Sequence, residues 1–93
     1  MPASVVVESS GAGEFRVRVR EGGGETVHTV TLTDADYIRL TSRRVAAEEL
    51  VRRSFEFLLE REPKEAILAR FALPVIGRYF PEYEQEIGRR LGA

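Results

Sequence analysis

The spacing of apolar residues along the chain changes at Thr33. Before Thr33 they recur at every second position, as in Phe15-Arg16-Val17-Arg18-Val19-Arg20, and after it they recur at every third or fourth position. An interval of two places side chains on alternate faces of a strand, whereas an interval of three or four places them along one side of a helix. The chain is therefore predicted to be α+β, with strands in residues 1–33 and helices in residues 34–93 of one domain.

Three strands are predicted in the first part of the chain. They cover Val5–Val7, Phe15–Arg20 and Thr26–Thr33, and glycine-containing turns at Ser9–Gly13 and Gly22–Gly24 separate them. Val30 and Leu32 match the apolar face of the second strand only if the connecting loop has an even number of residues. Short turns between neighbouring strands favour a three-stranded antiparallel meander.

Two helices are predicted after the strands. The pair Thr33 and Asp36 is typical of a helix start, so a first helix is expected from Asp34, with apolar contacts from Tyr37, Ile38 and Leu40. A longer amphipathic helix is expected from Ala47 to Arg61. Its apolar stripe consists of Ala47, Leu50, Val51, Ser54, Phe55 and Leu58. On its outer side, the expected ion pairs are Glu48–Arg52, Glu49–Arg53 and Arg52–Glu56.

Proline residues divide the remaining chain into short helices. Pro63 ends the long helix and is expected to open another, with Ala66, Ile67 and either Arg70 or Phe71 on successive turns. Pro74 and Pro81 repeat this punctuation. A last helix is expected from about Pro81 to Leu91, with Tyr83, Ile87 and Leu91 buried and Gly92 at its end. The long helix and these short helices should pack on one face of the sheet.

Composition excludes several classes of protein. The chain has 93 residues, 43% of them hydrophobic and 31% charged, and no apolar run approaches the roughly 18 residues that cross a bilayer. Because it contains no cysteine, it has neither disulfides nor thiolate ligands. The first residues, Met1-Pro2-Ala3-Ser4, lack the features of a secretory signal, so a cytoplasmic location is expected.

Arginine residues form one candidate binding surface. The chain contains thirteen arginines and one lysine, with a net charge of −1. Two groups are candidates for contact with an anion or a nucleic acid: Arg16, Arg18 and Arg20 on the polar face of the second strand, and Arg39, Arg43 and Arg44 near the end of the first helix. The alternative is a solvated strand face and simple compensation of the helix dipole.

A second candidate surface lies near the C-terminus. Large apolar side chains crowd around the bends there, and they suit either an aromatic pocket or a partner-binding patch. The patch would consist of Ile76, Tyr79, Phe80 and Tyr83. The alternative is that these side chains belong to the core, because a chain of this size has few other large side chains to fill it.

Catalytic chemistry has little support in the sequence. His28 is the single histidine, and by alternation it shares the face of Val30 and Leu32. No carboxylates lie at a metal-ligand spacing from it, and no nucleophile matches it. The run Gly22-Gly23-Gly24 lacks the Gly-Lys-Ser/Thr ending of a phosphate loop. We therefore assign no catalytic residue, cofactor or metal ligand.

Two stretches resemble known proteins. The predicted order of strand, short helix and longer helix over residues 26–60 resembles the ribbon-helix-helix fold of bacterial repressors and antitoxins. That resemblance implies a dimer whose paired strands read DNA, with Thr29, Thr31 and Thr33, or Val27 in their place, as the reading side chains. Residues 50–84, with Phe55-Glu56-Phe57-Leu58-Leu59-Glu60-Arg61-Glu62-Pro63 and Arg78-Tyr79-Phe80-Pro81-Glu82-Tyr83, resemble small bacterial proteins of no assigned activity.

The expected function is a non-enzymatic binding or regulatory module that acts through a protein partner or self-association. The alternative is a nucleic-acid-binding regulator that uses Arg16, Arg18 and Arg20. A third class, the small-molecule binder or enzyme subunit, requires a concave pocket with convergent polar groups.

Overall fold

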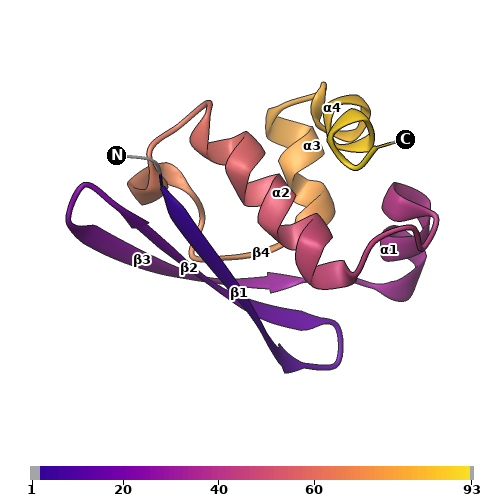
Figure 1. Ribbon diagram of the computed structural model, residues 1–93, viewed down its shortest axis with the longest axis horizontal. Helices are drawn as coiled ribbons and strands as arrows, with labels where there is room; N and C mark the ends of the chain where they lie inside the picture. Colours follow the sequence, from indigo (N-terminus) through magenta and orange to yellow (C-terminus); the bar gives the residue numbers. More distant parts are fainter. Residues whose placement is uncertain (1–2, 93) are drawn as a thin grey trace.

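A computed structural model describes residues 3–92 of the chain. The residues outside the described range are Met1, Pro2 and Ala93, and the first two belong to the N-terminal stretch that lacks the features of a secretory signal. Figure 1 shows a sheet with all helices on one of its faces. The strands are β1 (Ser4–Gly11), β2 (Glu14–Glu21), β3 (Gly24–Thr31) and β4 (Arg70–Ala72). The helices are α1 (Asp34–Thr41), α2 (Ala47–Leu59), α3 (Ile76–Tyr79) and α4 (Tyr83–Arg90), with single 3₁₀ turns η1 (Lys64–Ala66) and η2 (Leu73–Val75).

The α+β prediction and the antiparallel meander are confirmed. The sheet has the order β1-β2-β3-β4, and the first three strands pair antiparallel. Glu21 pairs with Gly24, so the β2–β3 loop is the two residues Gly22 and Gly23, with φ of 62° and 83°. Glycine adopts such positive φ values without steric cost, and an even loop keeps the apolar faces in register. The turn between β1 and β2 contains fewer residues than predicted, because β1 extends to Gly11 and β2 begins at Glu14.

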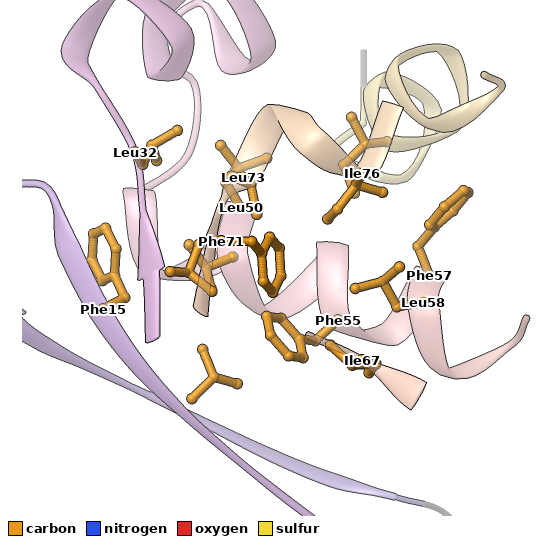
Figure 2. Close-up of a cluster of buried hydrophobic side chains, with 14 of the residues drawn as sticks. Phe15, Leu32, Leu50, Phe55, Phe57, Leu58, Ile67, Phe71, Leu73 and Ile76 are labelled. Atoms are coloured by element: carbon orange, nitrogen blue, oxygen red, sulfur yellow. The ribbon is translucent and has the colours of Figure 1, made fainter. Parts of the chain in front are cut away.

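The alternating pattern separates the two faces of the sheet. Phe15, Val17 and Val19 of β2 are buried and face the helices, and Val30 of β3 joins them. The intervening residues of β2 are exposed on the opposite face. Figure 2 shows the core between the sheet and the helical layer. The buried apolar residues of the described chain form one cluster, to which both the meander and the helices contribute.

Helix α1 begins as predicted. Thr33 is its N-cap, and its Oγ1 accepts a hydrogen bond from the backbone N–H of Asp36 at 3.1 Å. The expected apolar contact of Ile38 is wrong, because this side chain is 39% exposed. Thr41, at the end of the same helix, is buried, and its hydroxyl donates to the backbone carbonyl of Tyr37 at 2.7 Å.

Helix α2 crosses the sheet and supplies most of the helical part of the core. Its predicted stripe is buried from Leu50 to Leu58, with Ala47 partly buried. Phe57 lies off that stripe but is also fully buried, because Phe80 and Tyr83 pack against it with ring centroids 6.0 and 5.4 Å away. The helix is therefore apolar on two sides, one toward the sheet and one toward α3 and α4.

The predicted helix after Pro63 is wrong beyond its first turn. Pro63 precedes the short turn η1, and the chain then extends into β4, which pairs parallel to β3. Val30 is the pairing partner of Phe71, and the Thr29 N–H donates to the Ala69 carbonyl at 2.8 Å. Pairing with a distant strand thus overrides the local preference for helix.

The last helix is close to its prediction. It begins at Tyr83 rather than at Pro81, and Tyr83 and Ile87 are fully buried. Leu91 is partly buried against the core, and Gly92, with φ of 81°, follows it. Between Phe71 and this helix, η2 and α3 turn the chain back over α2, and this turn places the candidate site.

Candidate binding site

A pocket of about 130 Å³ opens in the helical layer between the C-terminal end of α2 and α3. Four buried side chains form its floor: Leu58, Ile67, Phe71 and Ile76. Exposed side chains stand at its rim, namely Leu68 at 47% and Tyr79 at 66% exposure. The remaining lining residues are Glu62, Ala66, Val75 and Phe80.

Local structure explains why the chain leaves a hollow here. Helix α2 ends at Leu59, and η1 carries the chain away from its axis. Lys64 of η1 is buried beside Gly24, next to the β2–β3 turn. Its Nζ lies 3.4 Å from the point that a Cβ atom would occupy if Gly24 carried a side chain. The chain then returns along β3 as β4 before α3 begins. The walls of the pocket are therefore segments held by tertiary contacts rather than by one helix.

Glu62 is the acidic side chain of this pocket. It is partly buried, and loss of water around its carboxylate raises its pKa above the ordinary range. In the part of the chain that the structure describes, no cation forms an ion pair with it. The neighbouring cations are bonded elsewhere, Arg61 to Glu82 at 3.1 Å and Lys64 to Glu65 at 2.8 Å.

The predicted C-terminal patch is divided by the structure. Ile76 and Tyr83 are buried, so they belong to the core, whereas Tyr79 is exposed and Phe80 is half-buried. The Tyr83 hydroxyl lies 2.6 Å from Ser54 Oγ, and burial raises the pKa of this phenol. Three of the four residues, all except Tyr83, line the pocket.

The strand arginines lie on the open face of the sheet, among carboxylates. Arg18 and Arg20 form ion pairs with Glu8 at 3.8 Å and Glu25 at 2.9 Å. Arg16 stands between Glu8 and Thr29 in the strand register. A further arginine that the sequence did not single out, Arg70 of β4, is 3.2 Å from Glu14. Both signs of charge therefore alternate across this face.

The three helix-end arginines lie elsewhere. Arg39 of α1 donates hydrogen bonds to Glu84 of α4 and to Asp36, and these raise its pKa. Arg43 and Arg44 are exposed in the turn after α1, which Figure 1 shows on the helical side of the sheet. The structure therefore does not bring these arginines onto the face that carries Arg16, Arg18 and Arg20.

The strand arrangement differs from the one that the ribbon-helix-helix resemblance implies. The order β3, α1, α2 is present as that resemblance implies. However, β3 lies between β2 and β4, and β4 pairs with it over Thr29–Thr31. The free edge that a strand-paired dimer needs is therefore occupied over that part of β3.

His28 is held as a structural residue. It is buried, and its Nδ1 lies 2.8 Å from the Leu68 carbonyl oxygen, which accepts a hydrogen bond from the Nδ1–H group. Its Nε2 lies 2.8 Å from Thr26 Oγ1, and its ring packs on Phe55 at 5.3 Å between centroids. Within residues 3–92, no three His, Cys, Asp or Glu side chains gather as a metal site.

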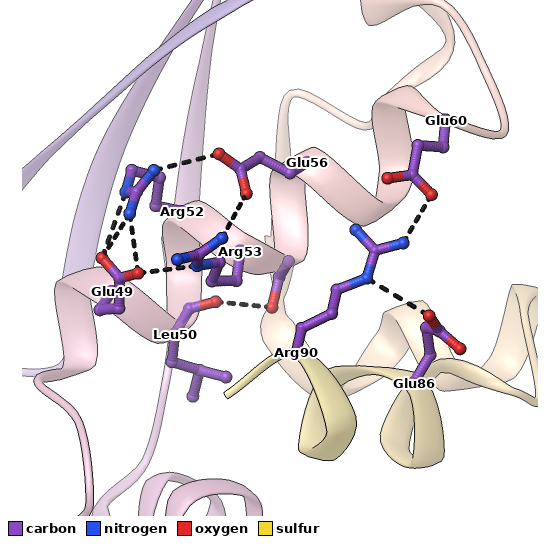
Figure 3. A network of polar contacts seen from close by, with 9 residues as sticks. Glu49, Leu50, Arg52, Arg53, Glu56, Glu60, Glu86 and Arg90 are labelled. Carbon is purple, nitrogen blue, oxygen red and sulfur yellow. Dashed lines mark hydrogen bonds and ion pairs between the residues drawn. The ribbon is translucent and has the colours of Figure 1, made fainter. Parts of the chain in front are cut away.

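Two carboxylates of α2, Glu49 and Glu56, form ion pairs. Figure 3 shows a closed network in which Arg52 and Arg53 each contact both Glu49 and Glu56. The predicted pairs Glu49–Arg53 and Arg52–Glu56 are confirmed, whereas Glu49 takes the place predicted for Glu48 beside Arg52. Hydrogen bonding from Arg52 lowers the pKa of Glu49.

Comparison with known protein families, curated proteins and solved structures gives no match. None of the helices described for residues 3–92 is long and apolar enough to span a membrane.

Proposed function

We propose that the protein is a non-enzymatic interaction module that binds a protein partner by receiving an apolar side chain of that partner in the pocket between α2 and α3. The main observation behind this proposal is that the pocket has a buried floor but an exposed apolar rim, formed by Leu68 and Tyr79. An apolar cavity of about 150 Å³ holds a benzene-sized ring, so the pocket volume fits one side chain. Removal of the rim side chains from water then supplies the driving force.

The chemistry of the lining supports binding rather than catalysis. Its titratable side chains are Glu62 and Tyr79, and Tyr79 stands at the open rim. Acid–base or nucleophilic catalysis requires a second group held within hydrogen-bond reach of the first. An apolar lining with one carboxylate instead resembles the anchor pockets of protein interfaces.

Photo-crosslinking tests this function in the native host. A benzoylphenylalanine at position 79 should yield a discrete adduct whose partner residue is apolar. The same probe at position 38, which is exposed on α1, serves as the control. Ala66→Phe, which fills the pocket, should abolish the adduct, whereas Ala72→Phe, outside the pocket, should leave it intact. Failure to form an adduct at 79, or an adduct indifferent to Ala66→Phe, would reject the proposal. An adduct with a second copy of this chain would identify the partner as itself.

A second candidate function is nucleic-acid binding by the open sheet face. The supporting observation is that Arg16, Arg18 and Arg20 are exposed in one row along β2. Interleaved carboxylates oppose it, because they repel phosphates. Titration of labelled duplex DNA and single-stranded RNA at low salt tests this function. Binding that falls steeply with salt and is lost when the three arginines become serine would favour it.

A further inference from the structure

We infer that the pocket selects an apolar group that carries a positive charge beside it, such as an apolar side chain next to a lysine or arginine in a partner segment. This inference rests on the proposed function, because it names the chemistry of the occupant of the same pocket. Its basis is Glu62, a lining residue of an otherwise mostly apolar hollow, which forms no ion pair among residues 3–92 while its neighbours Arg61 and Lys64 pair with other carboxylates.

The cations nearest in sequence are held away from Glu62. The Arg61 guanidinium lies over the Phe57 ring, 3.6 Å from its centroid, and also donates to the Phe57 carbonyl at 3.2 Å. Lys64 is buried with its ammonium against Glu65. The intramolecular contacts of these two cations are therefore already made, and Glu62 is left for a ligand.

Desolvation makes this arrangement selective. A partly buried carboxylate without a cation loses hydration that no ion pair among residues 3–92 replaces, which is consistent with the raised pKa of Glu62. A ligand ammonium or guanidinium replaces that hydration with a charge-assisted hydrogen bond. A ligand carboxylate at the same place meets like charge as well as further desolvation. Charge next to the anchoring group should therefore rank ligands of equal apolar size.

Three small probes with the same ring separate charge from size. They are phenethylammonium, 2-phenylethanol and 3-phenylpropionate, and each would be titrated at neutral pH while backbone amide NMR shifts are followed. Shifts should concentrate at pocket amides such as those of Ile67, Phe71 and Ile76. One ion pair near a protein surface corresponds to about 1 kcal/mol, so the ammonium should bind roughly 3- to 10-fold tighter than the alcohol and the carboxylate should bind weakest.

Two variants identify the group responsible. Glu62→Gln should bring the three affinities together while the alcohol still binds. The matched control is Glu65→Gln, which removes a carboxylate on η1 that pairs with Lys64 and lies outside the pocket lining. This control should leave the preference for the ammonium intact. The preference should also shrink with added salt and with acidification that protonates Glu62.

The outcomes separate this inference from the proposed function. If the alcohol shifts the pocket amides and the ammonium binds no more tightly, the charge selectivity is wrong and the pocket remains a binding site. If no probe shifts these amides, or if shifts fall on other surfaces, both proposals fail. An ammonium preference that survives Glu62→Gln would also overturn the inference.

Discussion

The meander and the C-terminal segment are built by opposite means. In residues 4–31, two two-residue turns and an alternating pattern set the structure, and each strand pairs with its neighbour in sequence. The pattern is interrupted once, by a shift in register between Ser9 and Gly11. In residues 60–92, short turns and helices follow one another without a long periodic pattern, and the segment takes its shape from α2 and β3. The regular region carries an open face on which charges of both signs alternate, and the irregular region carries the candidate pocket. The walls of that pocket therefore lie where distant contacts, rather than local periodicity, determine the backbone.

The strongest test of this contrast is Phe57→Ala. Phe57 is fully buried on the side of α2 that faces α3 and α4. Removal of its ring takes away the surface on which Phe80 and Tyr83 pack, and such substitutions cost about 3–5 kcal/mol. Urea denaturation followed by circular dichroism measures the loss. A cost below about 1 kcal/mol would show that the C-terminal segment does not depend on this packing.

The meander should be most sensitive at a turn. Gly13 has φ of 66°, and a Cβ there would lie 2.8 Å from the Leu32 carbonyl oxygen. Gly13→Ala should therefore cost about 1–3 kcal/mol through backbone strain and the close approach. Gly22→Ala is the matched control, because its φ of 62° is similar but its surroundings are open. It should cost about 1 kcal/mol. Equal losses of unfolding free energy would contradict a role for the contact with Leu32.

A smaller and asymmetric effect is expected where α4 joins α2. Ser54 Oγ donates to the Leu50 carbonyl at 2.8 Å, so its oxygen accepts a hydrogen bond from the Tyr83 hydroxyl. In Tyr83→Phe, the Ser54 hydroxyl still has the Leu50 carbonyl as acceptor, so the free energy of unfolding should fall by about 1 kcal/mol. In Ser54→Ala, the buried Tyr83 hydroxyl loses its acceptor, so the free energy of unfolding should fall by about 2 kcal/mol. Thermal and urea unfolding of both variants measure which substitution costs more free energy. A larger loss in Tyr83→Phe than in Ser54→Ala would show that the hydrogen bond between the two hydroxyls has the opposite donor.

The smallest expected effect is a difference in pH dependence between two neighbouring glutamates. Hydrogen bonding from Arg90 lowers the pKa of Glu60 in the folded protein, so its stabilisation is present above the unfolded pKa of about 4.3 and is lost as pH falls through the folded pKa. Burial raises the folded pKa of Glu62, so stability declines as pH rises from about 4.3 through that folded pKa.

Two variants isolate these opposite signs. Glu60→Gln should lower stability at pH 7 and flatten the acid-side decline, whereas Glu62→Gln should raise stability at pH 7 and have less effect at pH 3. Urea midpoints measured across this pH range check both directions. A loss of stability at pH 7 in Glu62→Gln would indicate a favourable contact for its carboxylate.

Sequence patterns predicted the features that depend on near neighbours. The alternation around Val17, the glycines at 22 and 23, the Thr33 cap and the stripe of α2 each have a short-range physical cause, and each is present. Strand β4 was missed because Arg70–Ala72 is too short for a periodic signal and pairs with residues about 40 positions earlier.

The candidate site was predicted only in part. Tyr79 and Phe80 were recognised as large apolar residues near a bend, but whether each side chain is buried depends on how α3 lies on α2. The sequence analysis did not single out Glu62, since the sequence does not show that its neighbours Arg61 and Lys64 bond elsewhere. The proline punctuation before η1 and α3 was the available signal for an irregular, hollowed region.

Because β4 pairs with β3 across a long stretch of chain, we expect the pocket to form late in folding. The hairpins close over two residues each, whereas β4 must close a loop of about 40 residues, which costs more chain entropy and slows formation. The same three-residue strand should open before the meander in native-state amide exchange. If the pocket takes the proposed occupant, that occupant should bind the closed form and should therefore slow the exchange of the β4 amides.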